Sequence, residues 1–349
     1  MQALIQKIID AGIRAPSGEN SQPWRFEIKN GEIYLFNLPE RDNSLYNWGQ
    51  RGAYIAHGSL LQNMEIMAES EGYGLNFSIF PDSNRPNLVA KISVMPPTKT
   101  PGNLAEQIFQ RATNRKPYKN YKLNENERRD LLNSENELRT KAKFILVEEK
   151  NTIAELGSLA GNNERILFEN EHLHHFFFSH INWDAEEDAK KSIGFYLKTL
   201  ELPPPVQLGF KLFKHWSVER VLNKIGFPKI IAIGNGKLYG TASAFGAIII
   251  DGDSPEQYIE AGRLLQLIWL KLTKHGLSLQ PLTGILFLMQ GIKAGEADKL
   301  STPHQELIKQ IYNKIQNLFG TPGTVVMMFR IGKADPPTAK SSRLKAQIS

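Results

Sequence analysis

The stretch Ala15-Pro-Ser-Gly-Glu-Asn-Ser-Gln-Pro-Trp24 lies between a predicted helix and a predicted strand. Its prolines restrict the backbone, while Gly18 is expected to give it freedom at one position. Ser17, Asn20 and Gln22 place a hydroxyl and amide groups on this short loop. Such groups can hydrogen-bond the polar edge of a heteroaromatic ligand. The alternative is a solvated turn whose side chains bond only its own backbone.

The segments around this loop predict a protein that mixes helices and strands. Apolar residues recur at helical spacing over 4–13, before the loop. After it, Asn30-Gly31 separates short strands over 24–28 and 32–36, and this dipeptide is typical of a tight hairpin turn. Further helices are expected over 51–71, 104–110, 124–132, 152–170, 254–272 and 304–318, and further strands within 76–94 and over 144–147, 243–250, 277–280 and 323–331.

Length, charge and cysteine content narrow the class of protein. The chain has 349 residues, which favours about two domains, and the Pro-rich segment 96–101 is the expected linker between units at 1–100 and 101–349. The absence of cysteine excludes disulfides, thiolate metal sites and cysteine nucleophiles. The dispersed net charge of +6 suits a phosphate-bearing ligand at least as well as a nucleic acid. Without a signal-peptide pattern or an apolar run of spanning length, we expect a cytoplasmic protein with no membrane partner.

Two spacings predict helix starts, and one long segment breaks the regular patterns. Thr152–Glu155 and Ser254–Gln257 each have the spacing of a capping box. Residues 171–240 are expected to form an irregular insertion or lid. Within it, 229–240 imitates a strand followed by a dinucleotide-binding loop. Too few residues follow for the helix that such a fold needs, so we expect a tight glycine turn.

Four histidines near the start of this insertion lack the spacing of a metal site. We therefore expect no metal there, and a helical or lid segment with partly buried aromatic residues instead. The histidines are His172, His174, His175 and His180.

A second motif, Arg111-Ala-Thr-Asn-Arg115, brings two guanidinium groups and one hydroxyl close together in the chain. Arginine forms bidentate, charge-assisted hydrogen bonds with phosphate, and the Thr113 hydroxyl adds a donor. The pattern favours a phosphate site, with a solvated basic loop as the alternative.

The loop that begins at Pro16 resembles the Pro-Ser-x-x-Asn-x-Gln-Pro-Trp signature of the nitroreductase superfamily, which contains FMN-dependent oxidoreductases of α+β fold. In that family the loop lies along the flavin ring of an FMN bound mainly by the other subunit. The resemblance implies FMN contacts from Pro16, Ser17, Gly18, Asn20 and Gln22.

Three other segments are similar to cofactor-binding parts of the same family. By this resemblance Arg111 and Thr113 hold the FMN phosphate or ribityl chain, and Arg115 stabilises the N1/O2 edge of the flavin. Lys340-Ser-Ser-Arg343-Leu344 resembles a tail that closes on the phosphate, with Arg343 as the matched cation and Lys340 displaced by one position. The alternative for this tail is a disordered basic end. Thr283 and Gly284 match a loop beside the flavin, although Pro-x-x-Gly is also common in plain turns.

The order of the motifs departs from that of ordinary family members. There the arginine motif precedes the Pro-Ser loop, whereas here the loop begins at residue 16 and the arginine motif at residue 111. The resemblance is therefore to the Acg-like branch. It implies a nitroreductase-like α+β fold of two degenerate halves with a lid, and one FMN site across both halves. Such a chain would act as a monomer, with a homodimer as the alternative.

The expected function is an FMN-dependent oxidoreductase that passes electrons from NAD(P)H to a nitro, quinone or similar acceptor. The resemblance assigns the redox chemistry to FMN, with no covalent nucleophile. The alternative is an FMN storage or sequestering protein whose lid covers the flavin. A flavin-free nucleic-acid binder is disfavoured, because the positive charge is dispersed and no binding motif supports it.

Overall fold

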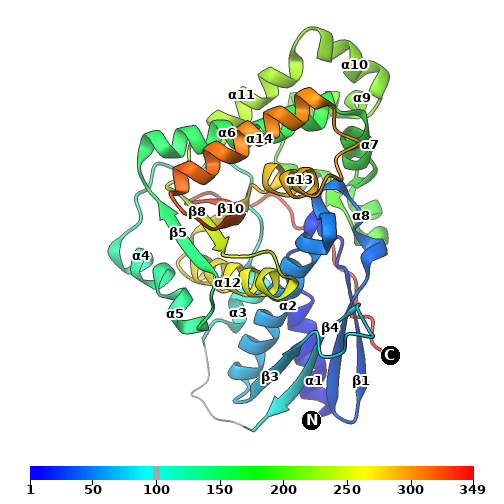
Figure 1. Ribbon diagram of the computed structural model, residues 1–349, viewed down its shortest axis with the longest axis vertical. Helices are drawn as coiled ribbons and strands as arrows, with labels where there is room; N and C mark the ends of the chain where they lie inside the picture. Colours follow the sequence, from blue (N-terminus) through cyan, green and yellow to red (C-terminus); the bar gives the residue numbers. More distant parts are fainter. Residues whose placement is uncertain (97–102) are drawn as a thin grey trace.

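The computed structural model describes residues 1–96 and 103–349, which form an α+β molecule. Two four-stranded antiparallel sheets lie in different parts of the molecule, each covered by helices (Figure 1). The α+β prediction is thus confirmed. Most of the expected linker, from residue 97 onward, lies outside the described residues.

The first sheet has the strand order β1-β2-β4-β3 and packs against two helices. Asn30 and Gly31 both have positive φ values, of 54° and 78°, so the predicted hairpin turn is present. The elements are α1 (Gln2–Gly12), β1 (Trp24–Lys29), β2 (Glu32–Asn37), α2 (Arg51–Ser70), β3 (Gly74–Ile79) and β4 (Leu88–Met95).

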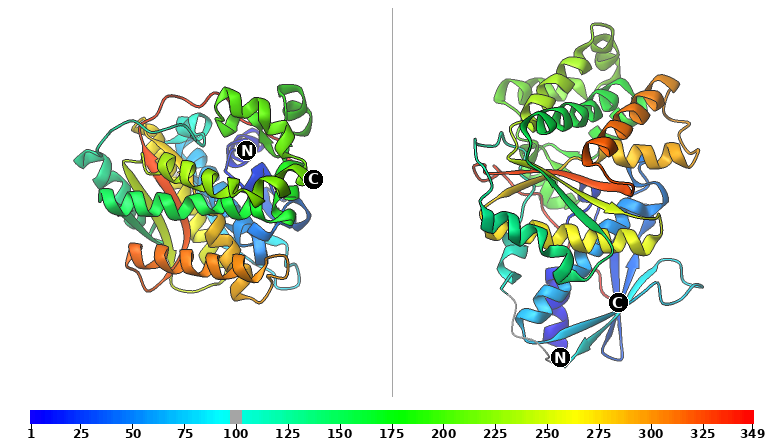
Figure 2. Two further views of the ribbon diagram at one scale, coloured as in Figure 1. Left: turned by 90° about the horizontal axis from the view of Figure 1, so that it is seen from above. Right: turned by 60° about the vertical axis from the view of Figure 1, so that its left-hand side comes forward.

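The second sheet has the order β5-β8-β10-β9 and lies between two layers of helices. Figure 2 shows it with α12 on one side and α6 and α14 on the other. Alternate side chains of the buried strand β8 point to opposite faces of the sheet. Phe245 packs toward α6 and α14, and Ile248 packs toward α12. The elements are β5 (Lys143–Val147), α6 (Lys150–Glu169), β8 (Ala244–Ile250), α12 (Pro255–Lys274), β9 (Ser278–Pro281), α13 (Gly284–Lys293), α14 (Thr302–Phe319) and β10 (Thr324–Gly332).

Helices α2 and α12 join the two halves through a reciprocal contact. A Cβ added at Gly58 would lie 2.0 Å from the Ile259 carbonyl oxygen, and one added at Gly262 would lie 2.0 Å from that of Ile55. The contact exchanges matching positions of the two helices, as a two-fold interface does. Ser59 Oγ also donates to the Gly262 carbonyl at 3.0 Å. Only glycine permits backbones to approach this closely.

The expectation that 171–240 is irregular is wrong, because most of this segment is helical. Several of its helices expose apolar residues on the outer face while burying others, which hides the one-sided pattern of an ordinary surface helix. The elements are α7 (Glu171–Ser179), β6 (Ile181–Asn182), α8 (Ala185–Lys191), β7 (Phe195–Tyr196), η4 (Leu197–Leu200), α9 (Pro204–Phe213), α10 (Trp216–Lys224) and α11 (Phe227–Tyr239).

The glycine turn expected within 229–240 is also wrong, since these residues belong mainly to α11. A Cβ on Gly161 of α6 would lie 2.5 Å from the Ala232 carbonyl oxygen, and one on Gly157 would lie 2.9 Å from that of Gly236. Glycines on both helices therefore allow close helix packing and do not form a turn. The remaining short elements are η1 (Gly18–Asn20), η2 (Pro39–Arg41), η3 (Leu45–Gln50), α3 (Ala105–Gln110), α4 (Glu125–Leu132) and α5 (Ser134–Leu138).

One of the two predicted capping boxes is present. Ser254 and Gln257 form theirs at the start of α12. Helix α6, however, begins at Lys150, before Thr152, because the Glu149 carboxylate accepts hydrogen bonds from the first backbone amides. A charged cap ahead of the predicted one thus moves the helix start.

The C-terminal segment after β10 is extended and returns to the first half. Phe26 donates its backbone N–H to the Gln347 carbonyl at 2.8 Å, and Ser349 donates to the Phe26 carbonyl at 3.1 Å. The end of the chain therefore pairs with the edge of β1. In residues 1–96 and 103–349, no helix is both long and apolar enough to cross a membrane.

Candidate cofactor site between the two halves

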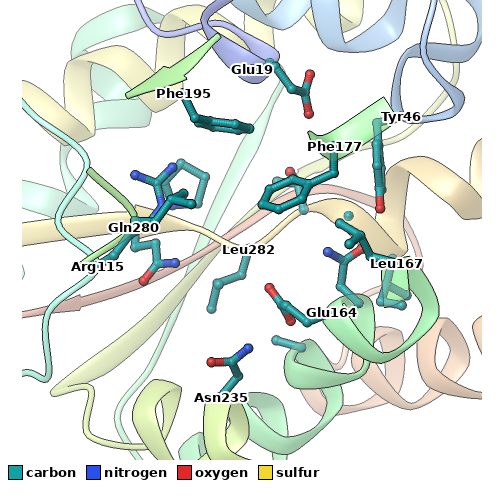
Figure 3. A pocket seen from close by; sticks show the side chains of 18 of the residues that line it. Glu19, Tyr46, Arg115, Glu164, Leu167, Phe177, Phe195, Asn235, Gln280 and Leu282 are labelled. Carbon is teal, nitrogen blue, oxygen red and sulfur yellow. The ribbon is translucent and has the colours of Figure 1, made fainter. Parts of the chain in front are cut away.

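A cavity of about 660 Å³ lies where the two halves meet. The loop Pro16–Glu19, η3 and the start of α2 form part of its wall, and most of the remainder comes from α6, α12, β9, β10, α13 and residues 176–239. The wall is mainly apolar, with a few polar side chains, as in sites for small molecules. Figure 3 shows Arg115 beside Gln280 on one side, and Glu164 and Asn235 on another.

The loop before β1 presents Pro16, Ser17 and Gly18 to this cavity. Ser17 Oγ accepts a hydrogen bond from the Gln22 backbone N–H at 3.0 Å, which closes the loop. The left-handed backbone lies at Glu19, Asn20 and Gln22, with φ values of 45°, 57° and 51°, and Gly18 does not have it. The expected role of Gly18 is therefore corrected. A Cβ there would lie 3.2 Å from Asp42 Oδ2, so the position favours glycine for space.

The Asn20 and Gln22 side chains turn toward protein partners outside the cavity wall. Asn20 Nδ2 donates to the Ser342 carbonyl at 2.9 Å, and Gln22 Nε2 donates to that of Ser192 at 2.6 Å. Gln22 Oε1 accepts from the Leu344 backbone N–H at 3.0 Å. These amides join the loop to the C-terminal segment and to residues after α8.

Arg111 and Arg343 meet just behind the loop, and Arg14 and Lys340 join them. Arg111 Nη2 donates to the Arg14 carbonyl at 2.9 Å, and Arg343 Nη1 donates to that of Ala15 at 2.5 Å. Lys340 Nζ donates to the Gln110 carbonyl at 2.8 Å. We call Arg14, Arg111, Lys340 and Arg343 the cation cluster. Among the described residues, no carboxylate forms an ion pair with any of them.

The pKa values of the cation cluster reflect burial and mutual repulsion. Burial, together with the Arg343 charge, lowers the pKa of Arg111 to about 9. Burial and the Arg14 charge lower the pKa of Arg343 to about 10, and the pKa of Lys340 is lowered by burial and by Arg111 and Arg14. The carbonyls at the ends of α1 and α3 favour cations, but they carry no full charge.

An anion is the partner that this cluster lacks. Arg111 is buried, and its Nε has no hydrogen-bond partner in the described chain. Its guanidinium lies 4.4 Å from the centre of the Trp269 ring, and Trp269 also lines the cavity. A phosphate ester that reached from the cavity past the Pro16 loop would supply the missing charge. The residues present therefore fit the phosphate end of a nucleotide cofactor.

Arg115, Thr283 and Gly284 line the cavity, whereas Thr113 does not. Arg115 Nη1 donates to the Thr199 carbonyl at 3.0 Å, and burial lowers the pKa of this guanidinium. Thr113 instead bridges to Leu279 beside β9 through its backbone. A Cβ at Gly284, at the start of α13, would lie 1.9 Å from Asn163 Oδ1, so a larger residue there would require the Asn163 side chain to move.

Several polar cavity residues were not singled out by the sequence, among them Glu19, Tyr46, Asn163 and Glu164. Burial raises the pKa of Glu164 to about 7. Burial and the nearby Asp42 charge together raise the pKa of Glu19 to about 8. Tyr46 Oη, Asn163 Oδ1 and Glu164 Oε2 are buried and have no hydrogen-bond partner within the described residues. Glu19 lies inside the loop motif and could have been found there. The other three lie in η3 or α6, where no sequence pattern marks a site.

His174 and His175 of α7 belong to an aromatic cluster. His174 is buried, and its Nε2 lies 2.7 Å from the Phe213 carbonyl oxygen. Its ring packs against Phe178 and Trp216. In the part of the chain that the structure describes, no group of three or more His, Cys, Asp or Glu side chains could hold a metal ion.

No family model matches the chain, but individual proteins do. It is 22% identical over 348 residues to the uncharacterized protein MT1398 of Mycobacterium tuberculosis (strain CDC 1551 / Oshkosh), an alignment of 96% of this chain and 46% of that protein. It is 31% identical over 120 residues to the "Putative NAD(P)H nitroreductase acg" of the same strain, covering 33% of this chain and 36% of the relative. The chain thus spans less than half the length of the relatives it matches.

Two similar solved structures are also nitroreductases. One, from Bacteroides fragilis with bound FMN, is 11% identical with a TM-score of 0.36, over 70% of this chain and 96% of that one. The other, NfnB from Mycobacterium smegmatis in complex with NADPH, is 15% identical with a TM-score of 0.33, over 66% and 88%. The relationship of this chain to the mycobacterial proteins rests on sequence similarity and not on these structural matches. By sequence, the chain is a distant relative of the mycobacterial putative NAD(P)H nitroreductase Acg and of MT1398.

Proposed function

We propose that this chain binds FMN at the junction of its halves and passes electrons from NAD(P)H to a nitro, quinone or similar acceptor. The observation that carries the proposal is the cation cluster, which pairs with no carboxylate of the described residues and lies beside an apolar cavity. When bound, FMN supplies the hydride-transfer chemistry, while the protein supplies binding and electrostatics.

The cation cluster would hold the phosphate. Arg111 has an unpartnered Nε and a planar guanidinium that suits a bidentate contact. Arg343 would add the second guanidinium, and Lys340, displaced in the tail motif, would join it. Arg14, which precedes the loop motif, would complete the positive field.

The cavity would hold the ring system. Its volume of about 660 Å³ falls within the range of small-molecule sites, roughly 300–1,000 Å³. Pro16, Ser17 and Gly18 would contact one part of the ring, and Thr283 and Gly284 another. The Arg115 guanidinium would place a positive charge in a part of the wall that is poor in water. This charge would favour the electron-rich, reduced form of the bound ring.

Glu164 would be the proton reservoir of the site. Its pKa of about 7 lets this carboxyl hold or release a proton near neutral pH. Oε1 accepts a hydrogen bond from the Tyr239 hydroxyl at 2.9 Å, so Oε2, which has no hydrogen-bond partner among the described residues, would carry the proton toward a reduced acceptor.

A second candidate function is FMN sequestration. It is favoured by the aromatic residues that α7, β7, α9 and α11 contribute to the cavity wall, such as Phe177, Phe195 and Phe227. We call these four elements the cover of the cavity. A permanent cover would exclude NAD(P)H and leave the flavin bound but inactive.

Anaerobic mixing with NAD(P)H separates these functions. The FMN-loaded protein should lose its flavin absorbance within seconds after NADH or NADPH is added, and should recover it when a quinone follows. Bound flavin that keeps its absorbance would contradict the oxidoreductase function and favour sequestration. Failure to take up FMN at all would overturn both.

A further inference from the structure

Helices α9, α10 and α11 form one end of the molecule, remote from both chain termini (Figure 1). We call these helices, residues 204–239, the tip. Large apolar side chains are exposed here more than elsewhere, since six of the ten exposed large apolar residues in the described chain lie on the tip. Their exposure runs from 38% for Val206 to 73% for Ile225, and the set is Val206, Leu212, Val221, Ile225, Ile230 and Ile233.

The charges of the tip have one sign. Its one acidic residue, Glu219, is fully buried, so it cannot offset the cations at the surface. Among the described residues, none of these cations forms an ion pair with a carboxylate. They are all exposed, and they are Lys211, Lys214, Arg220, Lys224, Lys229 and Lys237.

Apolar and basic residues alternate around the same helices. Val221 of α10 and Ile225, the residue that follows this helix, lie four positions apart, with Arg220 and Lys224 one position before each of them. Ile233 of α11 lies one turn from both Lys229 and Lys237. Lysine and arginine beside an exposed apolar stripe are typical of helices that lie in a membrane interface, where the long side chains reach the headgroups.

The inner side of the tip lines the cavity. Phe210, Phe213 and Ile231 face it from α9 and α11. Val206 and Ile230 line the cavity and are also 38% and 63% exposed, so the cavity reaches the surface between these helices. Apolar side chains of α9 and α11 thus lie at an opening between the tip surface and the site.

We propose that the tip docks on an anionic membrane surface and that the cavity takes a quinone dissolved in the lipid. The choice of quinone rests on the proposed oxidoreductase function, whereas the docking does not. Two copies of the tip would bring like charges together, which disfavours self-association through this face. Anionic headgroups supply the missing negative charge, and the acyl region covers residues such as Leu212 and Ile225.

Vesicle flotation tests the docking directly. The FMN-loaded protein should float with vesicles of phosphatidylcholine and phosphatidylglycerol, and should remain in solution with phosphatidylcholine alone. Lys224→Gln and Lys211→Gln should each weaken binding about fivefold, which corresponds to about 1 kcal/mol per cation. The double variant Leu212→Ser/Ile225→Ser should weaken it by about tenfold or more. High salt should reduce binding of every variant.

Leu132→Ser provides the matched control, because Leu132 is an exposed apolar residue on α4, outside the tip. It should leave flotation unchanged. Equal binding to both kinds of vesicle, or none to either, would overturn the docking. A change of molecular mass in the tip variants, measured by sedimentation without vesicles, would also overturn it, because the face would then be a contact between copies.

Turnover tests the quinone. The protein should reduce a long-chain quinone held in anionic vesicles, and the tip variants should lower this rate while leaving reduction of a water-soluble short-chain quinone unchanged. Equal effects on both quinones would contradict entry from the lipid. Flotation without reduction of either quinone would reject the oxidoreductase function and leave the docking intact.

Discussion

Arg111 and Arg343 lie more than 200 positions apart in the sequence, yet they lie together in the cation cluster, where the Arg343 charge helps to lower the pKa of Arg111. Local motifs predicted both residues as phosphate ligands. The motifs could not predict that Arg14 lies beside these two arginines, because its position depends on where the end of α1 lies relative to α3. They also could not show that Asn20 and Gln22 bond the C-terminal segment, since local sequence does not determine which way a loop side chain points.

Replacing Arg111 by leucine tests the phosphate role. Arg111→Leu should weaken FMN binding by about 10- to 100-fold, because a charge-assisted contact contributes about 1.5–3 kcal/mol. The unliganded protein should keep its melting temperature or gain a little, since a buried cation without a carboxylate is removed. Isothermal titration and thermal unfolding measure the two effects. Arg128→Leu, which affects an arginine paired with Glu148, is the control. Unchanged FMN affinity in Arg111→Leu would remove this residue from the site.

Replacing Arg115 by leucine tests the electrostatic role. Arg115→Leu should lower the two-electron reduction potential of the bound flavin by about 30–60 mV, because loss of a fixed cation disfavours the electron-rich ring. FMN affinity should fall less than in Arg111→Leu. Redox titration against a reference dye measures the potential, and an unaltered value would contradict the assignment.

Glu219 makes a prediction about pH and stability. Burial raises its pKa from 4.5 to about 7, and neither carboxylate oxygen has a hydrogen-bond partner in the described chain. The folded protein binds this proton more tightly than the unfolded chain, so its contribution to stability is lost as pH rises from 4.5 through 7. Glu219→Gln cannot ionise and should gain about 1–3 kcal/mol of unfolding free energy at pH 8, with little change near pH 4.5. An equal gain at both pH values in urea unfolding would contradict this.

Helices with one apolar face were predictable, and the helices of the tip were not. The spacing of apolar residues over 4–13 and 51–71 predicted α1 and α2 to within a few residues. Residues 204–239 carry apolar side chains both toward the cavity and toward solvent, so no single stripe marks them as helical. The glycine turn predicted within 229–240 was wrong for a related reason, because Gly236 serves close packing of α11 against α6 and does not form a turn.

The α2–α12 contact predicts a sharp difference between glycines. Gly58→Ala should destabilise the protein by about 3 kcal/mol or more, because the new methyl group would overlap the Ile259 carbonyl. Gly234→Ala is the control. It lies in helix α11 with open space around its added Cβ, and should stabilise the protein by about 0.5–1 kcal/mol. Urea unfolding measures both, and equal effects would contradict the close contact.

At the scale of the whole molecule, parts of both halves meet at one cavity. The first half contributes the Pro16 loop to the cavity wall and the second contributes Arg115, while Arg14, Arg111 and Arg343 of the cation cluster lie behind the loop. The sequence predicted the α+β class and both motifs, because these are local patterns. The burial of Glu164 and the opening through the tip depend on distant segments meeting, which no local pattern determines.

The sequence led us to expect no membrane partner, because no segment is long and apolar enough to span a bilayer. The proposed contact of the tip with a membrane surface is a different kind of association and needs no spanning segment. That the single chain acts as a monomer stays a prediction.

Comparison of FMN with riboflavin tests the central claim most directly. The two ligands share the ring system and differ by the phosphate that the cation cluster would hold. In fluorescence titrations FMN should bind at least about 100-fold more tightly than riboflavin. This preference should largely disappear in Arg111→Leu and Arg343→Leu. Equal affinity for both ligands in the unaltered protein, or no binding of either, would contradict an FMN site built across the two halves.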